Sequence, residues 1–259
     1  MIGSIIGDIV GSIYEFNNIK TTEFPLFGKG CDYTDDSILT IATADWLLNG
    51  GEVAKYYAKY ADENPCPMGM YGSGFCMWVS RAVEGNYEPY NSCGNGSAMR
   101  VGPIGWAFDT IEDVMKYAEL SAACTHNHPE GIKGAQVVAV AILMARQKKT
   151  KEEIKKYIES KFEYDLNFTC DEIRPIYEFE AICQTSVPQA VRAFLDSNSF
   201  EEAIRLAISI GGDSDTIGCI TGSIAEAYYG VPNEIKEKAM SYLPEKYKQV
   251  VTAFELKYK

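Results

Sequence analysis

Two groups of acidic and hydroxyl side chains, far apart in the chain, have the composition of a site for divalent cations. The first is Thr34-Asp35-Asp36, and the second is Asp213-Ser214-Asp215-Thr216. Hard cations such as Mg²⁺ and Mn²⁺ prefer oxygen ligands, and carboxylates above all. The two groups could therefore supply opposite walls of one metal site, which would make the chain a metal-dependent enzyme.

Both groups also fit a plain structural role, because each precedes an apolar stretch with helical spacing. Asp, Ser and Thr are common N-cap residues, and acids in the first turn interact favourably with the helix dipole. One cap is enough for one helix, however, and each group holds two carboxylates and a threonine. From these residues alone, capping and metal binding both remain open.

Three further segments contain residues that suit a binding or catalytic role. Glu15 ends the first predicted helix, where the dipole does not favour an acid, so it is either a solvated helix end or functional. In the segment 94–100, GNGSAMR, paired glycines would let backbone N–H groups approach a ligand, and Arg100 could face a phosphate. The alternative for this segment is a tight turn into a short helix.

The only two histidines, His126 and His128, lie in the segment THNHP. Their spacing, with no cysteine or third histidine nearby, does not match a zinc site. We expect a polar loop that orients a substrate, or else a structural loop before the following helix.

Composition excludes several classes of protein. The net charge of −12 disfavours binding to nucleic acid and to anionic membranes. None of the eight cysteines forms a CxxC pair, and the apolar start carries Asp8 and Glu15 without a basic segment, unlike a signal peptide. We therefore expect reduced thiols in a cytoplasmic protein, and a monomer.

The hydrophobic pattern is helical almost throughout, which predicts one all-α domain spanning residues 1–259. The segments 131–148 and 215–230 are apolar nearly all round and should be central, whereas 151–160 should lie on the surface. Gly3, Gly7 and Gly11 recur every four residues and predict close helix packing. Loops are expected at 17–33, 63–74, 85–104 and 161–175. The predicted helices that follow the first are 34–48, 52–62, 111–123, 131–148, 151–160, 186–196, 200–210, 215–230 and 244–257.

These blocks, in this order, resemble the ADP-ribosylglycohydrolase family, which includes dinitrogenase reductase-activating glycohydrolases and hydrolases of ADP-ribosylarginine and ADP-ribosylserine. The matching stretches are GDIVGSIYEF, YTDDS, YGSG, GNGSAMR, THNHP and GGDSDT. The resemblance implies a compact, mostly orthogonal multi-helix bundle. It also implies two Mg²⁺ or Mn²⁺ ions as cofactors, with ligands Thr34, Asp35, Asp36, Asp213, Asp215 and Thr216.

The resemblance also assigns roles to the remaining candidates. Glu15 matches the family's mobile acid and, with Asp36, would be catalytic, while His126 matches a histidine that lines the ADP-ribose cleft. The diphosphate and distal ribose would be wrapped by a loop that contributes Gly94, Asn95, Gly96, Ser97, Met99 and Arg100. Cys93 stands where relatives often have an aromatic residue, so the adenine would stack on Tyr90, Trp106 or His126 instead.

The activity implied is hydrolysis of the glycosidic bond at the distal ribose, which releases ADP-ribose from a modified protein or small molecule. Two cations would orient a water at the anomeric carbon, and carboxylates favour an oxocarbenium-like transition state. A catalytically silent ADP-ribose or nucleotide binder and a metal-dependent phosphoesterase remain alternatives. The sequence defines neither the acceptor nor the preference for Mg²⁺ or Mn²⁺.

Overall fold

The computed structural model describes all 259 residues, and its regular secondary structure is entirely helical, as predicted. Two isolated backbone bridges, Thr34 with Met68 and Gly94 with Ile182, are the only β-type pairings. The helices are α1 (Ile2–Gly11), α2 (Asp35–Asn49), α3 (Val53–Glu63), α4 (Ser73–Ala82), α5 (Gly96–Met99), α6 (Gly102–Ala107), α7 (Ile111–Ala123), α8 (Pro129–Arg146), α9 (Lys151–Phe162), α10 (Cys170–Ile173), α11 (Cys183–Asp196), α12 (Phe200–Ser209), α13 (Ser214–Tyr229), α14 (Asn233–Tyr242) and α15 (Glu245–Tyr258).

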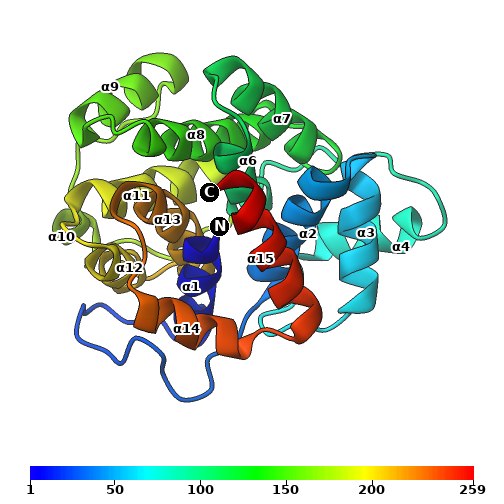
Figure 1. Cartoon of the computed structure of the whole chain (residues 1–259). Coiled ribbons are helices and arrows are strands. Elements are labelled where there is room, and N and C mark those ends of the chain that lie inside the picture. The colour runs from blue at the N-terminus through cyan, green and yellow to red at the C-terminus, as the bar shows by residue number, and fades with distance from the viewer.

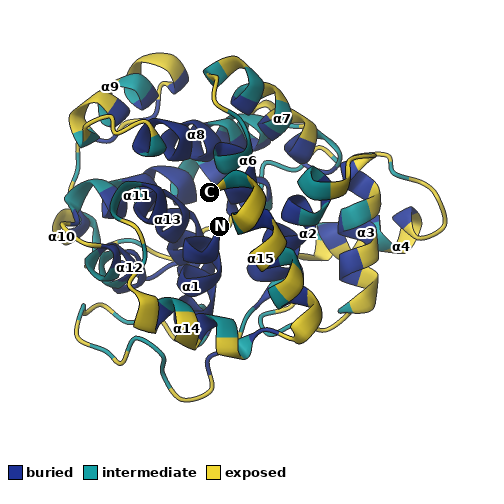
Figure 2. Cartoon of the chain, viewed as in Figure 1, coloured by how far each residue is buried: buried dark blue, intermediate teal, exposed yellow.

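Helices α1, α8 and α13 form the centre of the molecule, surrounded by the other helices (Figure 1). They are buried along nearly their whole length, which Figure 2 shows in dark blue. This confirms the central position predicted for 131–148 and 215–230. Helix α9 lies outside and buries only Ile154, Ile158 and Phe162, as its amphipathic pattern predicted.

Helices α1 and α13 pack backbone against backbone through the glycines predicted to do so. A Cβ atom added to Gly7 would lie 1.9 Å from the carbonyl oxygen of Gly218, and one added to Gly3 would lie 2.1 Å from that of Gly222. Gly11 is equally close to Asp215, at 2.5 Å from its Cα. No larger residue fits at these contacts, so the glycine stripe sets the distance between the two central helices.

The predicted helices are confirmed, with ends shifted by a few residues, but shorter helices were missed. The start of α4 was predicted as a loop because Gly72 precedes the helix and Gly74 lies in its first turn; its formation depends on burial of Phe75 and Trp78. Helix α14 buries only Ile235 and Ala239, too few for a clear period. The predicted loops 85–104 and 161–175 are interrupted by the short helices α5, α6 and α10.

The prediction that Glu15 ends the first helix is wrong. Helix α1 stops at Gly11, and Glu15 lies in the turn that follows it. From there the chain runs without helical structure to α2, as predicted for 17–33, and forms the long blue loop that passes beside α14 in Figure 1. Glu15 is therefore held by loop contacts and not by a helix.

All eight cysteines are free thiols, and four of them are buried: Cys31, Cys170, Cys183 and Cys219. None of the helices combines the length and the apolar character that a membrane crossing requires.

The contact between α1 and α13 generates a prediction about stability. Substituting Gly7→Ala adds about 1 kcal/mol of helix propensity but forces the Cβ into a backbone carbonyl, so we expect a net loss of about 2 kcal/mol. Thermal unfolding should then begin about 5 °C lower. Gly72→Ala is the matched control, because nothing lies within 4 Å of its added Cβ, and the backbone there has φ −56°. Equal melting temperatures for the two variants would contradict close packing at Gly7.

Candidate functional site

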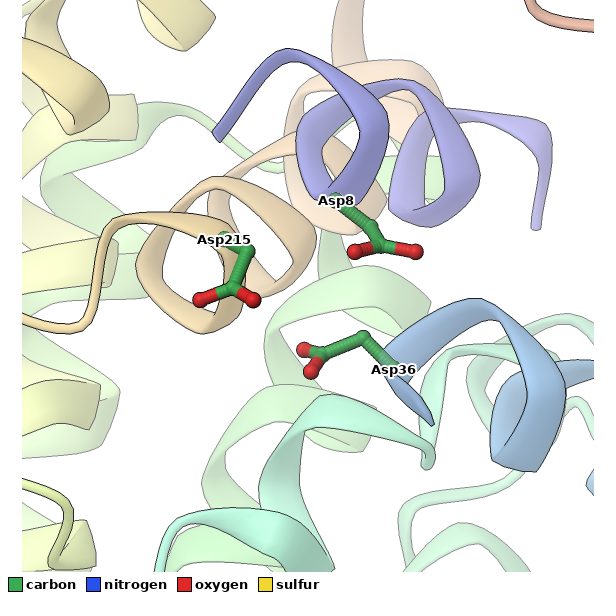
Figure 3. A group of neighbouring side chains, drawn as sticks. All are labelled: Asp8, Asp36 and Asp215. Carbon is green, nitrogen blue, oxygen red and sulfur yellow. The ribbon is translucent and has the colours of Figure 1, made fainter. Parts of the chain in front are cut away.

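Three helices bring carboxylates to one point beside a cavity. Asp8 comes from α1, Asp36 from the first turn of α2, and Asp215 from the first turn of α13. Figure 3 shows the three side chains converging from their separate helices. The two sequence groups therefore do form opposite walls of one acidic centre, and Asp8 adds a third wall.

The acids form two groups that share one member. Oxygen atoms of Asp8, Asp36 and Asp215 all lie within 4.8 Å of one another, and so do oxygen atoms of Glu15, Asp213 and Asp215. Asp215 belongs to both groups. This arrangement offers two neighbouring cation positions with a shared carboxylate, which is a donor set for hard divalent ions.

Asp8 orients the start of α2, a role that the sequence analysis missed. Its carboxylate accepts hydrogen bonds from the Thr34 hydroxyl at 2.6 Å, from the Thr34 backbone N–H at 3.0 Å and from the Ser37 backbone N–H at 3.1 Å. The Ser37 hydroxyl also donates to it. An acidic residue inside an otherwise apolar, glycine-striped helix was the signal that could have identified Asp8.

The two threonines occupy different environments. Thr34 is fully buried, caps α2 by accepting from the Asp36 N–H, and donates its hydroxyl to Asp8, so it does not line the cavity. Thr216 lines the cavity, and its hydroxyl donates to Asp36 Oδ2 at 3.3 Å. Thr34 therefore serves the capping role and the acidic centre together, which the sequence had left as alternatives.

No cationic side chain neutralises the acidic centre, because none of the ion pairs in the structure includes one of its carboxylates. Asp36 Oδ1 and Glu15 Oε2 are buried without a hydrogen-bond partner. Such atoms cost free energy unless something else satisfies them. The orphaned oxygens and the all-oxygen donor set both fit divalent cations.

Burial raises the pKa of every acid in the centre: Asp8, Glu15, Asp35, Asp36, Asp213 and Asp215. The pKa of Asp8 rises to about 6, and burial followed by repulsion from Asp213 raises that of Glu15 to about 8. Without a cation, the centre therefore holds protons at neutral pH.

The cavity next to the acids has a volume of about 440 Å³, within the range for a small-molecule site. Its lining includes the acidic group Glu15, Asp35, Asp36, Asp213 and Asp215 with Thr216, and also Tyr90, Ser92, Gly94, Asn95, Gly96 and His126. The predicted site residues thus gather around one cavity.

The GNGSAMR loop is fastened to the acidic centre through Asn95. Its side-chain amide donates to Asp213 Oδ2 at 2.7 Å and to the Ser186 hydroxyl at 3.1 Å, and its backbone N–H donates to Ala181 O. Ser97, predicted to bind substrate, does not line the cavity, because its hydroxyl donates to Gly131 O at 2.7 Å in α8. Met99 lines the cavity.

Arg100 is fully buried and lines the cavity, with its guanidinium 4.0 Å from the centroid of the Tyr57 ring. Its Nη2 donates to Ser121 O at 2.8 Å and to the Thr125 hydroxyl at 2.7 Å, whereas Nε and Nη1 have no partner. Nη2 therefore makes only contacts within the protein, and through Thr125 it anchors the loop that carries His126.

His126 presents one ring nitrogen to the glycines of the GNGSAMR loop. Thr125 Oγ1 lies 2.7 Å from His126 Nδ1 and also accepts a hydrogen bond from Arg100. The other ring nitrogen, Nε2, faces Gly94 and Gly96. Burial and the nearby Arg100 charge hold the pKa of His126 well below its usual value. A neutral imidazole therefore offers Nε2 to the cavity as its free hydrogen-bonding atom.

Aromatic side chains border the cavity at two places. Tyr90 and His126 pack with ring centroids 5.7 Å apart, while Trp106 lies outside the lining and contacts Arg146 and Lys259. Of the three residues considered for stacking, Tyr90 and His126 remain. The sequence analysis missed a second pair, Phe16 and Phe179, whose exposed rings stack 6.1 Å apart and also line the cavity. No periodicity marks these two loop residues.

Comparisons with known proteins show similarity over almost the whole chain. The sequence model of a family described as ADP-ribosylglycohydrolase matches residues 1–256. The chain is similar to the ADP-ribosylhydrolase ARH3 of Mus musculus, at 27% identity over 98% of this chain and 86% of that protein. It is also similar to the ADP-ribosylarginine hydrolase Tri1 of Pseudomonas putida, at 26% identity over 92% and 72% of the two chains. A solved "ADP-ribosylglycohydrolase-related protein complex" superposes with a TM-score of 0.71, at 23% identity over 93% of this chain and 95% of that one.

The raised pKa values generate a prediction about stability and pH. Unfolded carboxyls titrate near pH 4, whereas those of the centre titrate higher, at about 6 for Asp8 and about 8 for Glu15. Between pH 5 and 8 the folded state therefore holds more protons, and the melting temperature of metal-free protein should fall as pH rises. His126 and the Met1 amino group, whose pKa values are lowered, act in the opposite sense but are fewer.

Mg²⁺ should raise the melting temperature more at pH 8 than at pH 6, because it competes with protons for the same oxygens. NaCl at equal ionic strength is the control for simple screening. Equal stabilisation by the two salts at both pH values would contradict a cation site.

Proposed function

The chain belongs to the ADP-ribosylglycohydrolase family, and we propose that it is a metal-dependent hydrolase that releases ADP-ribose from a modified acceptor. The bond cleaved is the glycosidic bond at the distal ribose. One observation carries the proposal: carboxylates from three helices meet beside a cavity that is also lined by a glycine loop and His126. A bond next to the carboxylates could then be cut while the glycine loop and His126 hold the rest of the nucleotide.

We propose two Mg²⁺ or Mn²⁺ ions as cofactors of the acidic centre, on the basis of its two carboxylate groups and shared Asp215. The proposed ligands are Thr34, Asp35, Asp36, Asp213, Asp215 and Thr216. When bound, divalent cations would neutralise the cluster, orient the ribose hydroxyls and a water, and stabilise developing negative charge. Asp8 would support this centre from below by orienting Thr34 and the start of α2.

Glu15 is the proposed general acid–base or water-orienting residue. Its carboxylate lies beside Asp213 and Asp215 and lines the cavity, and one of its oxygens has no protein partner. Burial and repulsion from Asp213 raise its pKa to about 8 in the cation-free centre, so it takes up a proton more readily than an ordinary carboxyl, which suits a general acid–base residue. Asp36, which also presents an unpartnered oxygen, would share the catalytic role.

The remaining residues would hold the ADP-ribose. Gly94 and Gly96 lack side chains opposite the His126 ring, so a diphosphate could approach the loop backbone and His126 Nε2 closely. Tyr90, packed against His126, is the proposed adenine platform. Asn95 and Arg100 also line the cavity; Asn95 fastens this loop to Asp213, and Arg100 anchors the histidine loop through Nη2.

The domain organisation, the location and the substrate class follow from the same features. The cavity draws on residues from Glu15 to Thr216, which supports one catalytic domain over residues 1–259. Eight free thiols, with Cys66 and Cys76 exposed, suit the reducing cytoplasm. The substrate would be an ADP-ribosylated protein or small molecule, and we expect the enzyme to act as a monomer.

Product analysis tests the function directly. Incubated with Mg²⁺ or Mn²⁺ and proteins carrying arginine-linked or serine-linked ADP-ribose, the protein should release free ADP-ribose from at least one of them. AMP as the product would indicate diphosphate cleavage and contradict the proposal. Glu15→Gln should still bind ADP-ribose in calorimetry, but its turnover should fall about 100-fold or more, the scale of a lost acid–base group. Unchanged turnover would exclude Glu15 from catalysis.

The two histidines provide a matched pair for the binding role. His126→Ala should weaken ADP-ribose binding about tenfold, because it removes one hydrogen-bonding ring nitrogen and a packing surface from the cavity. His128→Ala removes only the side chain that caps α8 by accepting from the Glu130 N–H, so its affinity should equal that of the parent. Titration calorimetry with ADP-ribose and Mg²⁺ distinguishes them, and equal affinities would reduce His126 to a structural role.

A further inference from the structure

A single side chain joins the loop that carries Glu15 to the loop that carries Asp213. The Asn18 amide nitrogen lies 2.7 Å from Tyr14 O and 2.9 Å from Glu15 O, and it also lies 2.9 Å from Gly212 O. The Asn18 amide oxygen accepts from the Gly212 N–H at 2.7 Å. Asn18 thus contacts the backbone on both sides, although the two segments are 194 residues apart in the chain.

Glu15 needs such an anchor because no helix positions it. Helix α1 ends at Gly11, and the residues that follow Glu15 form no regular structure before α2. The unpartnered Glu15 Oε2 makes no hydrogen bond that could fix the side chain. The backbone of Gly69 borders this oxygen: a Cβ atom added to Gly69 would lie 2.7 Å from Glu15 Oε2. Glu15 therefore has room at this place because residue 69 is a glycine, and Gly69 offers no side chain to hold the carboxylate. The position of the carboxylate therefore depends on the position of its own backbone.

The loop that carries Asp213 has an unusual backbone conformation just before this residue. Both backbone polar groups of Gly212, the N–H and the carbonyl, face Asn18. Gly211 and Gly212 have φ values of +73° and +78°, a region that glycine adopts readily and other residues rarely do. Because Asp213 follows directly, the Asn18 contact also fixes the start of the second acidic group. A side-chain amide suits this contact because its nitrogen donates to the Gly212 carbonyl while its oxygen accepts from the Gly212 N–H.

Lys20 adds a second tie between the same parts of the molecule. Its ammonium donates to Ile210 O and to Tyr177 O, both at 2.6 Å. This contact holds the loop 12–33 in place generally, but it does not touch the backbone of Glu15 or Gly212. Asn18, in contrast, contacts the backbone of Glu15 and of Gly212 directly.

We propose that Asn18 is a positioning residue for hydrolysis, which holds Glu15 at the correct place against Asp213 and Asp215. The inference rests on the proposed function of Glu15. It identifies a residue outside the acidic centre whose loss should act through Glu15 and not through the fold as a whole.

A double-mutant cycle tests this proposal, with Asn17→Ala as the matched control. Asn17 is the neighbouring asparagine, exposed and without side-chain hydrogen bonds. At saturating Mg²⁺, Asn18→Ala should lower kcat at least tenfold, since a misplacement of about 1 Å can cost about 100-fold. In the Glu15→Gln background the same change should lower kcat less than about twofold, because the residue it positions is already inactive. Asn17→Ala should have no effect in either background.

Hydrogen exchange of the metal-free protein gives a readout that does not depend on activity. Asn18→Ala should speed exchange of the Gly212 amide and of peptides covering residues 12–18, while Asn17→Ala should leave them unchanged. The positioning role would be overturned if Asn18→Ala lowered kcat by the same factor in the parent protein and in the Glu15→Gln variant. Unchanged exchange of the Gly212 amide in Asn18→Ala would also overturn it. If the parent protein releases no ADP-ribose, the proposed function fails, and the exchange experiment still decides whether Asn18 holds the two loops together.

Discussion

The acidic centre depends on how closely α1 and α13 approach each other. Glycines on both helices allow backbone contact, with the Cβ position of Gly7 only 1.9 Å from Gly218 O. At this distance Asp8 on one helix and Asp215 on the other present oxygens to the same point, and α2 brings Asp36 to it. A helix pair separated by ordinary side chains would place these carboxylates farther apart. The close contact is therefore a structural requirement of the site.

The same contact creates an electrostatic cost that the protein alone does not offset. Hydrogen bonds from Thr34, Ser37 and Asn95 satisfy Asp8 and Asp213, but Asp36 and Glu15 keep unpartnered oxygens. Burial of several carboxylates without a counter-charge favours protonation or cation binding. Protons and divalent cations should therefore compete for this centre. An electrostatic cost of this kind is expected at functional sites, where the well-packed surrounding helices tolerate it.

The sequence predicted the long helices and the two acidic groups because both have strong local signals. Apolar periodicity marks α8 and α13, and repeated carboxylates beside threonine mark the helix starts near Thr34 and Thr216. Asp8 was missed because its role depends on contacts with α2 and α13, which no local pattern reports. Glu15 was identified, but the end of its helix was misplaced by four residues, since the turn at 12–14 continues the same apolar composition. The Asn18 contact and the Phe16–Phe179 pair are long-range and had no sequence signal.

The number of Mn²⁺ ions bound per chain tests the central claim most directly, because each bound ion removes the electron paramagnetic resonance signal of free Mn²⁺. The account predicts two ions per chain in the parent protein. It also predicts that Asp215→Asn weakens both, because Asp215 belongs to both carboxylate groups. Binding of no Mn²⁺ by the parent protein, or two ions bound with unchanged affinity in Asp215→Asn, would contradict a shared two-cation centre.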